Sequence, residues 1–416
     1  MRFQALLCFI LSLSQGSAEL CPFSDKCRCV KDASVPDGSA FTTVLCENVV
    51  LSQTPFAIFQ GVKYKVKESM KITGDVTTIL DNQFSAFGEI SHLELTQATG
   101  DIRNQNWQQY AFAEVIIKSL QITGVGNLQA VMQVQDKYSE KLAILKSTQL
   151  QVNDDVLKNY PSLTLLTLDS TQITVTDDAF KSVSDKLEDL ALTSSSLTEI
   201  PIKALSSLKN LKRLNLGSNQ IKTILPNSFS QLTKLEKLLL TTNPIATIDK
   251  AAFLALTFLN ELDLSNTELT TIDLSIFAIK KEAEREFALL LHSNTKAKSV
   301  IVSGESSDFP DQTLIQIKNS ALETLDPKVG DVLNAKPTLL LNIDDNQNLL
   351  CDDKLNWMSR HLSCTMKLEA TQAKCASPDK YKGKLLEVYL DDVDPDPNCD
   401  YVATTTLVLP TTTAGT

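Results

Sequence analysis

Residues 211–234 read LKRLNLGSNQIKTILPNSFSQLTK, and residues 235–258 read LEKLLLTTNPIATIDKAAFLALTF. Both segments are 24 residues long, with leucine at positions one, four and six, asparagine at position nine and isoleucine at position eleven. The same leucine spacing begins at Leu163, Leu187 and Leu259, so five consecutive segments share one register. A fixed period of this length predicts a stack of similar structural units.

The apolar positions predict how each unit folds. Leucines two residues apart, such as Leu214 and Leu216, point to the same side of an extended chain, so they predict a short strand with one buried face. Positions fourteen and nineteen are also apolar, as at Ile224 and Phe229, and we expect them to fill the opposite side of the core. Position nine holds asparagine or a hydroxyl residue: Thr171, Ser195, Asn219, Asn243 and Thr267.

This pattern resembles the extracellular leucine-rich repeat family, and the resemblance extends over nearly the whole chain. It implies an α/β solenoid, a leucine-rich repeat horseshoe with about twelve repeats of about 24 residues. In that family the asparagine at position nine forms a ladder of hydrogen bonds at the turn, so the hydroxyl substitutions imply a partial ladder here. Each unit is too small to bury its apolar face alone, and stacking supplies the stability.

Less regular copies extend the array in both directions. The stretch Leu142 to Leu150 is an irregular copy with one extra residue, and the charged stretch Lys280 to Glu286 predicts either a solvated helical face or an inserted loop. The upstream strand pairs are Met70 with Ile72, Leu93 with Leu95, and Leu120 with Ile122. The downstream copies contain Leu289, Leu291 and Asn294, then Ile315, Ile317 and Leu322, then Leu341, Ile343 and Asn346.

The chain has nine cysteines, of which eight remain once Cys8 is removed with the leader described below. These eight fall into two groups of four near the two ends of the sequence: Cys21, Cys27, Cys29 and Cys46, then Cys351, Cys364, Cys375 and Cys399. An even count in an exported chain predicts disulfides. Zinc is the alternative, but neither group has paired C-x-x-C spacing and no histidine lies near the first.

The cysteine groups are similar to the family's end caps. The first group matches the N-terminal cap, and the resemblance implies Cys21–Cys29 and Cys27–Cys46. Residues 349–358 are similar to the C-terminal cap, but Asp353 stands where the family has its second cysteine. Cys364 is expected to take that place, and pairing by order gives Cys351–Cys375 and Cys364–Cys399.

Residues 1–18 have the features of a secretory leader: Arg2, the apolar stretch from Ala5 to Leu13 and a small-residue cleavage site. We see no later apolar stretch that could span a membrane, so we expect a secreted, extracellular protein. The predicted segments are the leader (1–18), an N-terminal cysteine cap (19–62), the repeats (63–348), a C-terminal cysteine cap (349–400) and a Thr-rich tail (401–416). That tail is either disordered or an O-glycosylated stalk.

Composition and motifs exclude several classes of function. The net charge of −11 argues against binding nucleic acid or an anionic membrane. The three histidines (His92, His292 and His361) are too far apart to share a site in a solenoid, and no hydrolase, metalloprotease or phosphate-loop motif occurs. The acidic run from Asp391 to Asp396 suggests calcium only weakly, and a solvated loop is the alternative. We therefore predict no enzyme activity, no cofactor and no metal.

The surface that remains for binding is the concave face of the predicted sheet. The side chains expected to point outward there include Asp189, Arg213, Asn215, Lys237, Glu261 and Asp263. One interpretation is a ladder of opposite charges that stabilises the sheet. The other is a polar patch for an extracellular protein partner. No aromatic cluster appears at these positions, although strong interfaces favour one.

Two classes of function follow. The first is a secreted recognition or matrix-interaction protein that binds another protein. The second is an accessory subunit that stabilises a secreted enzyme, because the overall layout is similar to that of the non-catalytic subunit of arthropod luciferin monooxygenase. Repeat folds carry many partners on one scaffold, so the sequence does not identify the partner.

Overall fold

The computed structural model describes residues 18–53, 56, 61, 63–98, 106–124, 133–146, 150–169, 172–277, 279, 286–304, 309, 312–336, 338–363 and 367–394. The chain divides into two units, residues 1–187 and 188–416. Thr171, Cys364, Cys399, most of Lys280 to Glu286, the tail 401–416 and all of the predicted leader except Ala18 lie outside the described residues.

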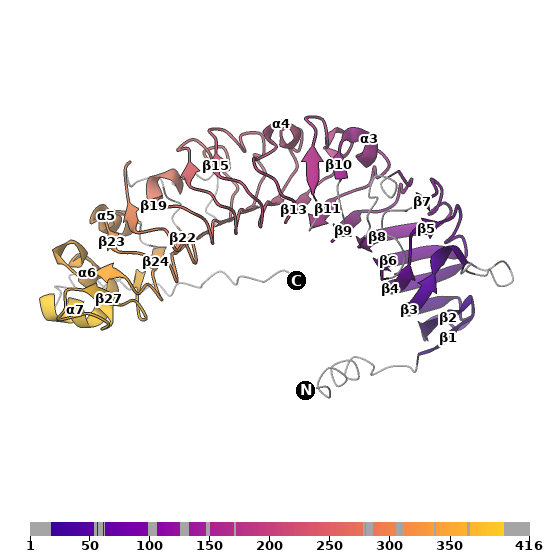
Figure 1. Cartoon of the computed structure of the whole chain (residues 1–416), viewed down its shortest axis with the longest axis horizontal. Coiled ribbons are helices and arrows are strands. Elements are labelled where there is room, and N and C mark those ends of the chain that lie inside the picture. Colours follow the sequence, from indigo (N-terminus) through magenta and orange to yellow (C-terminus); the bar gives the residue numbers. More distant parts are fainter. Residues whose placement is uncertain are drawn as a thin grey trace. The chain divides into compact units, whose positions relative to one another are not determined.

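The first unit is built on one main sheet in the order β1-β2-β3-β4-β6-β8-β9-β11 (Figure 1). Its strands are β1 (Glu19–Cys21), β2 (Ser24–Lys31), β3 (Ala40–Val50), β4 (Tyr64–Asp75), β6 (Phe87–Gln97), β8 (Ile116–Thr123), β9 (Lys141–Leu145) and β11 (Leu165–Asp169). The first three strands pair antiparallel, and every later pair from β3 onward is parallel. The antiparallel strands therefore close one end of a parallel array.

Short elements connect the strands of the first unit. Two small parallel sheets, β5 with β7 and β10 with β12, run beside the main sheet. The connecting elements are β5 (Thr78–Ile79), β7 (Asn106–Trp107), β10 (Leu150–Val152), β12 (Ile173–Val175), α3 (Asp154–Leu157) and the 3-10 turns η1 (Leu51–Gln53) and η2 (Lys181–Val183).

The second unit has a main sheet of parallel strands, in the order β13-β14-β16-β18-β20-β22-β24-β26. Its strands are β13 (Asp189–Thr193), β14 (Arg213–Asn215), β16 (Lys237–Leu239), β18 (Glu261–Asp263), β20 (Phe287–Leu290), β22 (Gln312–Gln316), β24 (Thr338–Asn342) and β26 (Leu368–Glu369). The pairings of β13, β14, β16 and β18 join residues 24 positions apart, which is the period of the sequence repeat.

The other side of the second unit consists of short strands and helical turns (Figure 1). Three small parallel sheets form there: β15 with β17, β19 with β21 and β23, and β25 with β27. These elements are β15 (Thr223–Ile224), β17 (Thr247–Ile248), β19 (Thr271–Asp273), β21 (Ser299–Ile301), β23 (Thr324–Leu325), β25 (Leu349–Leu350), β27 (Cys375–Ser377), α4 (Ile202–Leu205), η3 (Leu274–Phe277), α5 (Lys328–Ala335), η5 (Asp353–Leu355), α6 (Met358–Ser363) and α7 (Leu386–Val393).

The core of the second unit lies between these two sides. The leucines at repeat positions one, four and six are buried, as at Leu211, Leu214 and Leu216. Position nineteen supplies stacked rings: Phe253 lies 6.0 Å from Phe229 and 6.0 Å from Phe277, between ring centroids. Alternation within the strands and the 24-residue period together therefore produce one continuous apolar interior.

Buried asparagines join consecutive turns of the second unit. Asn243 donates its Nδ2 hydrogens to the carbonyls of Leu216 and Leu240, and its Oδ1 accepts the N–H of Ile221. Asn219, Asn294 and Asn346 make corresponding bonds. Because buried peptide groups need partners, these amides satisfy backbone that the short strands leave unpaired.

Disulfides lie near both ends of the described chain. Cys21 is bonded to Cys29 and Cys27 to Cys46, joining β1, β2 and β3. Cys351 is bonded to Cys375, beside the pairing of β25 with β27. The expected Cys364–Cys399 pair lies outside the described residues. In the chain-entropy model, each such cross-link stabilises the fold by about 3 kcal/mol.

The upstream strands differ from a regular repeat. The expected apolar pairs at Met70, Leu93 and Leu120 do face the core, but β4, β6 and β8 contain 12, 11 and 8 residues where β14 contains three. Further residues are buried on the N-terminal side of each pair, as at Tyr64 and Val66 in β4, although a register shift between Val66 and Met70 interrupts strict alternation. A strand continues as long as one face can be buried.

Candidate functional site

Parallel pairing brings together the candidate charges on the solvent face of the main sheet in the second unit. Asp189 is opposite Arg213, Arg213 is opposite Lys237, and Lys237 is opposite Glu261. These four residues form a single row across β13, β14, β16 and β18, which we call the charge row.

The charge row neutralises itself in pairs. The Arg213 guanidinium donates two hydrogen bonds to the Asp189 carboxylate, with Nη2 2.6 Å from Oδ2. Lys237 Nζ lies 2.8 Å from Glu261 Oε2. All four side chains remain partly exposed, so water screens the pairs and each contributes only about 0.2–1 kcal/mol.

The two remaining candidates, Asn215 and Asp263, occupy the neighbouring row. Asn215 Oδ1 accepts the N–H of Gly217 at 2.9 Å, and Asp263 Oδ1 accepts the N–H of Ser265 at 2.8 Å. Both side chains therefore hold the turn that follows their own strand. Each still leaves part of its surface facing solvent.

Beyond Glu261 the same row becomes apolar. Its next members are Ala288, Leu314 and Leu340, all 4–6% exposed. Lys367 follows on the N-terminal side of β26 and donates from Nζ to the Leu333 and Lys336 carbonyls at the end of α5, at 2.7 and 3.0 Å. Among the described residues, the charged members of this row therefore lie on the strands of the most regular repeats, except for Lys367 beside β26.

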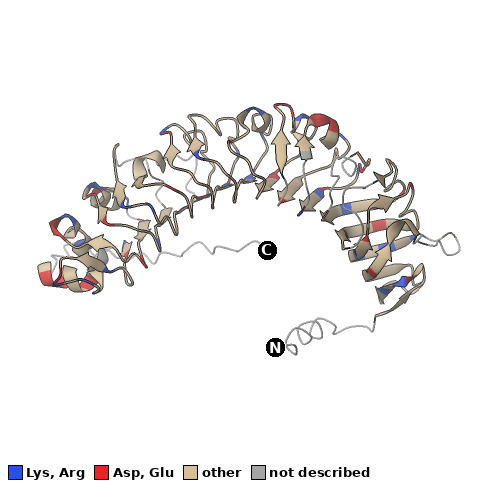
Figure 2. Ribbon diagram, in the orientation of Figure 1, with Lys and Arg blue, Asp and Glu red and all other residues tan. Residues whose placement is uncertain are grey.

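Lysine and arginine are interspersed with aspartate and glutamate within each unit (Figure 2). The charge row has this character, and so do the pairs Lys71–Glu94 and Lys118–Glu89 on the main sheet of the first unit. The structure thus places opposite charges next to each other on neighbouring strands in both units.

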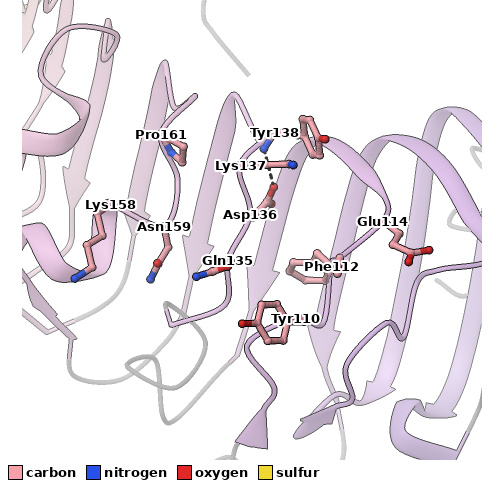
Figure 3. Close-up of a pocket in the computed structure, with 11 residues that line it drawn as sticks. Tyr110, Phe112, Glu114, Gln135, Asp136, Lys137, Tyr138, Lys158, Asn159 and Pro161 are labelled. Carbon is pink, nitrogen blue, oxygen red and sulfur yellow. Dashed lines mark hydrogen bonds between the residues drawn. The ribbon is translucent and has the colours of Figure 1, made fainter.

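A pocket of about 350 Å³ lies in the first unit, where the turns before β8, β9 and β11 approach one another (Figure 3). We call it the Tyr110–Tyr138 pocket. Its walls include the rings of Tyr110, Phe112 and Tyr138 together with Pro161, while Gln135, Asp136, Lys137 and Asn159 supply polar groups. A volume of this size is within the range of small-ligand sites.

A buried carboxylate organises the inner part of the Tyr110–Tyr138 pocket. Asp136 Oδ1 accepts the N–H groups of Tyr138 and Ser139 at 3.2 and 3.1 Å, and Oδ2 accepts the Ser139 hydroxyl at 2.5 Å. The backbone N–H of Asp136 donates to the Asn159 carbonyl at 3.1 Å. Burial raises the pKa of Asp136, although these hydrogen bonds act in the opposite direction.

The two histidines whose side chains the structure describes have different polar neighbours. His92 Nδ1 lies 2.9 Å from Ser119 Oγ on the first unit's main sheet, while His292 is in the second unit and donates its backbone N–H to Ser265 Oγ at 3.0 Å. Burial lowers the pKa of both imidazoles. The side chain of His361 lies outside the part of the chain that the structure describes.

No group of three or more His, Cys, Asp or Glu side chains in the described ranges is arranged to hold a metal ion. In the same ranges, every helix is too short or too polar to cross a membrane.

Comparisons with known proteins agree with the repeat geometry. The family model described as leucine rich repeat matches residues 185–245, which include β13, β14 and β16. A chain of the octameric complex of Latrophilin 3, Unc5D and FLRT2 (LRR) aligns with a TM-score of 0.55 at 18% identity, covering 72% of this chain and 88% of that one.

The chain has the leucine-rich repeat fold. The expected solenoid of about twelve turns is confirmed by the parallel pairing and by these matches. A chain of the mouse RP105/MD-1 complex aligns with a TM-score of 0.49 at 17% identity, over 81% of this chain, which spans only 54% of that longer chain. No curated protein matches the chain in sequence.

Sequence reasoning did not find the Tyr110–Tyr138 pocket. Its residues come from the turns of irregular repeats: paired residues are 27 positions apart between β6 and β8, 22 apart between β8 and β9, and 24 apart only between β9 and β11. The sequence feature that could have indicated this pocket is a pair of tyrosines, Tyr110 and Tyr138. They lie shortly before β8 and β9, which are the main-sheet strands of successive turns.

Proposed function

We propose that this chain is a secreted, non-enzymatic protein that binds an extracellular protein partner through its solenoid surface, in recognition or matrix interaction. One observation carries the proposal. The core of each regular repeat uses positions one, four, six, nine, eleven, fourteen and nineteen, whereas positions three and five project from the main sheet without contributing to it. Side chains that the core does not require can be selected for a partner.

The comparisons support this role by analogy of fold. The complex named above contains a leucine-rich repeat component assembled with Latrophilin 3 and Unc5D, and the mouse chain is part of the RP105/MD-1 complex. For the present chain we assign binding to the charge row with Asn215 and Asp263. We also assign the segments 19–62 and 349–400 as caps of the repeat region 63–348.

Secretion is supported by the sequence of residues 1–18 and by the disulfides. Three disulfides among the described residues require an oxidising compartment to form and persist. The leader is expected to be removed after Ala18, leaving a mature chain of about 44 kDa, from 45.8 kDa less a leader of about 2 kDa.

The native mass of the protein from its natural secretion tests the proposal first. A recognition protein is expected to elute as a species near its own mass and to capture its partner reversibly. Constant co-elution with one enzyme in a fixed ratio, through high salt, would overturn the free-standing role and establish the accessory-subunit role instead.

Variants then test the assigned surface on the partner so identified. The double variant Asp189→Arg, Arg213→Asp keeps an ion pair at these positions but reverses the order of the two charges that a partner would meet. We therefore expect the fold to be retained and the affinity for the partner to fall about tenfold or more. The matched control exchanges Lys298 and Glu323, whose side chains pair at 2.8 Å on the small sheets of the same unit. Equal affinities for both exchanged variants would exclude the charge row from binding.

A further inference from the structure

We propose that the Tyr110–Tyr138 pocket binds a short segment of a protein partner that carries a carboxylate beside an apolar side chain. The inference rests on the protein-binding function proposed above and adds the chemistry of what is bound. It places a contact in the first unit, outside the charge row.

The tyrosines are the first reason. The structure describes six tyrosines, of which Tyr64, Tyr160, Tyr381 and Tyr389 are buried. The other two, Tyr110 and Tyr138, are 49% and 41% exposed, and both line this one pocket. A tyrosine ring offers a large apolar face with little conformational entropy to lose, which is why tyrosine is enriched at the energetic centres of protein interfaces.

The second reason is that the pocket is already shaped. Tyr110 is fixed through its backbone, since its N–H donates to Asp81 Oδ1 at 2.8 Å and its carbonyl accepts the N–H of Asn82 at 3.0 Å. Tyr138 is fixed by the bond from its N–H to Asp136 Oδ1. Backbone that is held before binding costs little to order when a ligand arrives.

The third reason is the charge that remains available at the rim. Glu114 is paired with Lys63 at 3.1 Å, and Lys158 is paired with Asp155 at 2.6 Å. Lys137 has no carboxylate partner among the described residues, and its Nζ lies 4.9 Å from the centroid of the Tyr138 ring.

The carboxylate of Asp136 is buried, and both of its oxygens already accept hydrogen bonds. The free charge of the pocket is therefore one cation beside aromatic walls. This arrangement complements a carboxylate that is carried next to an apolar group (Figure 3).

The test uses the whole mature chain labelled with 3-fluorotyrosine and followed by fluorine NMR, with signals assigned from Tyr110→Phe and Tyr138→Phe. The probes are N-acetyl-Leu-Glu-Leu-amide and its isosteric counterpart N-acetyl-Leu-Gln-Leu-amide. We expect the glutamate peptide to shift the Tyr110 and Tyr138 signals alone, and to bind at least fivefold more tightly than the glutamine peptide. Lys137→Gln is expected to remove that difference, whereas Lys250→Gln, at an exposed lysine of the second unit, is expected to keep it.

Three results would overturn the proposal: no shift of either tyrosine signal, equal binding of the two peptides, or a stronger response to glucuronic acid, which would assign the pocket to an acidic sugar. Lys137 and Lys250 are exposed, so neither variant should disturb folding. Because the test needs no natural partner, its failure is distinguishable from failure of the native-mass experiment.

Discussion

The side-chain oxygen of Asn219 accepts the backbone N–H of Ser195, one turn earlier in the second unit, at 3.0 Å. The same oxygen accepts the N–H of Leu197, and Nδ2 donates to the carbonyls of Leu192 and Leu216. One amide thus satisfies backbone groups in two consecutive turns. These bonds are buried, where an unpaired polar group is costly.

Asn219→Ala is therefore expected to lower the free energy of unfolding by about 2–3 kcal/mol, since it leaves buried peptide groups unpaired. Urea unfolding followed by circular dichroism measures the loss. Gln220→Ala is the matched control, because Gln220 is the next residue and its side chain is exposed. Similar losses in the two variants would show that the asparagine bonds are not responsible.

The pair formed by Asp189 and Arg213 is expected to contribute little to stability. Its side chains are 17% and 55% exposed, so a double-mutant cycle with alanine should give a coupling of about 0.2–1 kcal/mol that shrinks as salt is added. Urea unfolding at low and high salt measures it. A larger coupling free energy that does not change with salt concentration would mean that the pair is far more shielded from water than this geometry implies.

Asp136 is expected to make stability depend on pH in the acidic range. Because burial raises its pKa in the folded state, the folded state binds its proton more tightly than the unfolded state does. Its contribution is thus fully present below about pH 3.9, the ordinary value for aspartate, and is lost as the pH rises through the raised pKa.

Asp136→Asn should remove this dependence while keeping an oxygen for the Tyr138 and Ser139 N–H groups. Asp136→Ala should destabilise the fold by about 2 kcal/mol, because it leaves those donors without an acceptor. Urea unfolding between pH 3 and pH 7, as an approximate range, compares the three proteins. An unchanged pH profile in the asparagine variant would refute this assignment.

His92 and His292 are expected to make the folded state less stable as the pH falls, which is the opposite of the effect of Asp136. Burial lowers the pKa of His92 and of His292, so each imidazole binds its proton less tightly in the folded state than in the unfolded state. Their contribution is complete above about pH 6.5 and is lost as the pH falls through the lowered values.

Thermal unfolding should therefore show a lower midpoint at pH 5.5 than at pH 7.5, as approximate conditions, and the double variant His92→Gln, His292→Gln should show a smaller difference. The pKa values themselves follow from the histidine proton resonances of the folded protein. Values at or above the ordinary one would contradict the effect of burial.

The second unit was largely predictable from its sequence, because a strict period fixes the register. Once Leu214 and Leu238 are known to be equivalent, the positions of Arg213 and Lys237 in one row follow directly. The partial asparagine ladder follows in the same way from Asn219, Asn243 and their hydroxyl replacements. The period could not reveal that Arg213 bonds Asp189 while Lys237 bonds Glu261, because side-chain choices among adjacent charges depend on rotamers.

The structure of the first unit, and the apolar residues that continue the charge row, were harder to predict from the sequence. The lengths of β4 and β6 depend on buried residues that lie outside the repeat pattern, such as Val66 and Phe87. Ala288 continues the row of Glu261 only because 27 residues, not 24, separate them. The Tyr110–Tyr138 pocket is formed by turns between irregular repeats. Turns of that kind follow local hydrogen bonds, such as those of Asp136, more than any period.

The equivalence of Asn219 and Asn243 restricts which changes of chain length this region can accept. Each amide accepts the N–H at position eleven of the turn before it and donates to the position-six carbonyls of that turn and of its own, so removing 24 residues beginning at Leu211 would bring Asn243 against Leu192 and Leu197 with these bonds re-formed. Removing a single residue between Leu214 and Leu216 would instead turn one of these leucines away from the core. Changes within the strand and the asparagine turn are therefore accepted as whole repeats, whereas changes of a few residues are accommodated between strands, as in the 27-residue step from Glu261 to Ala288.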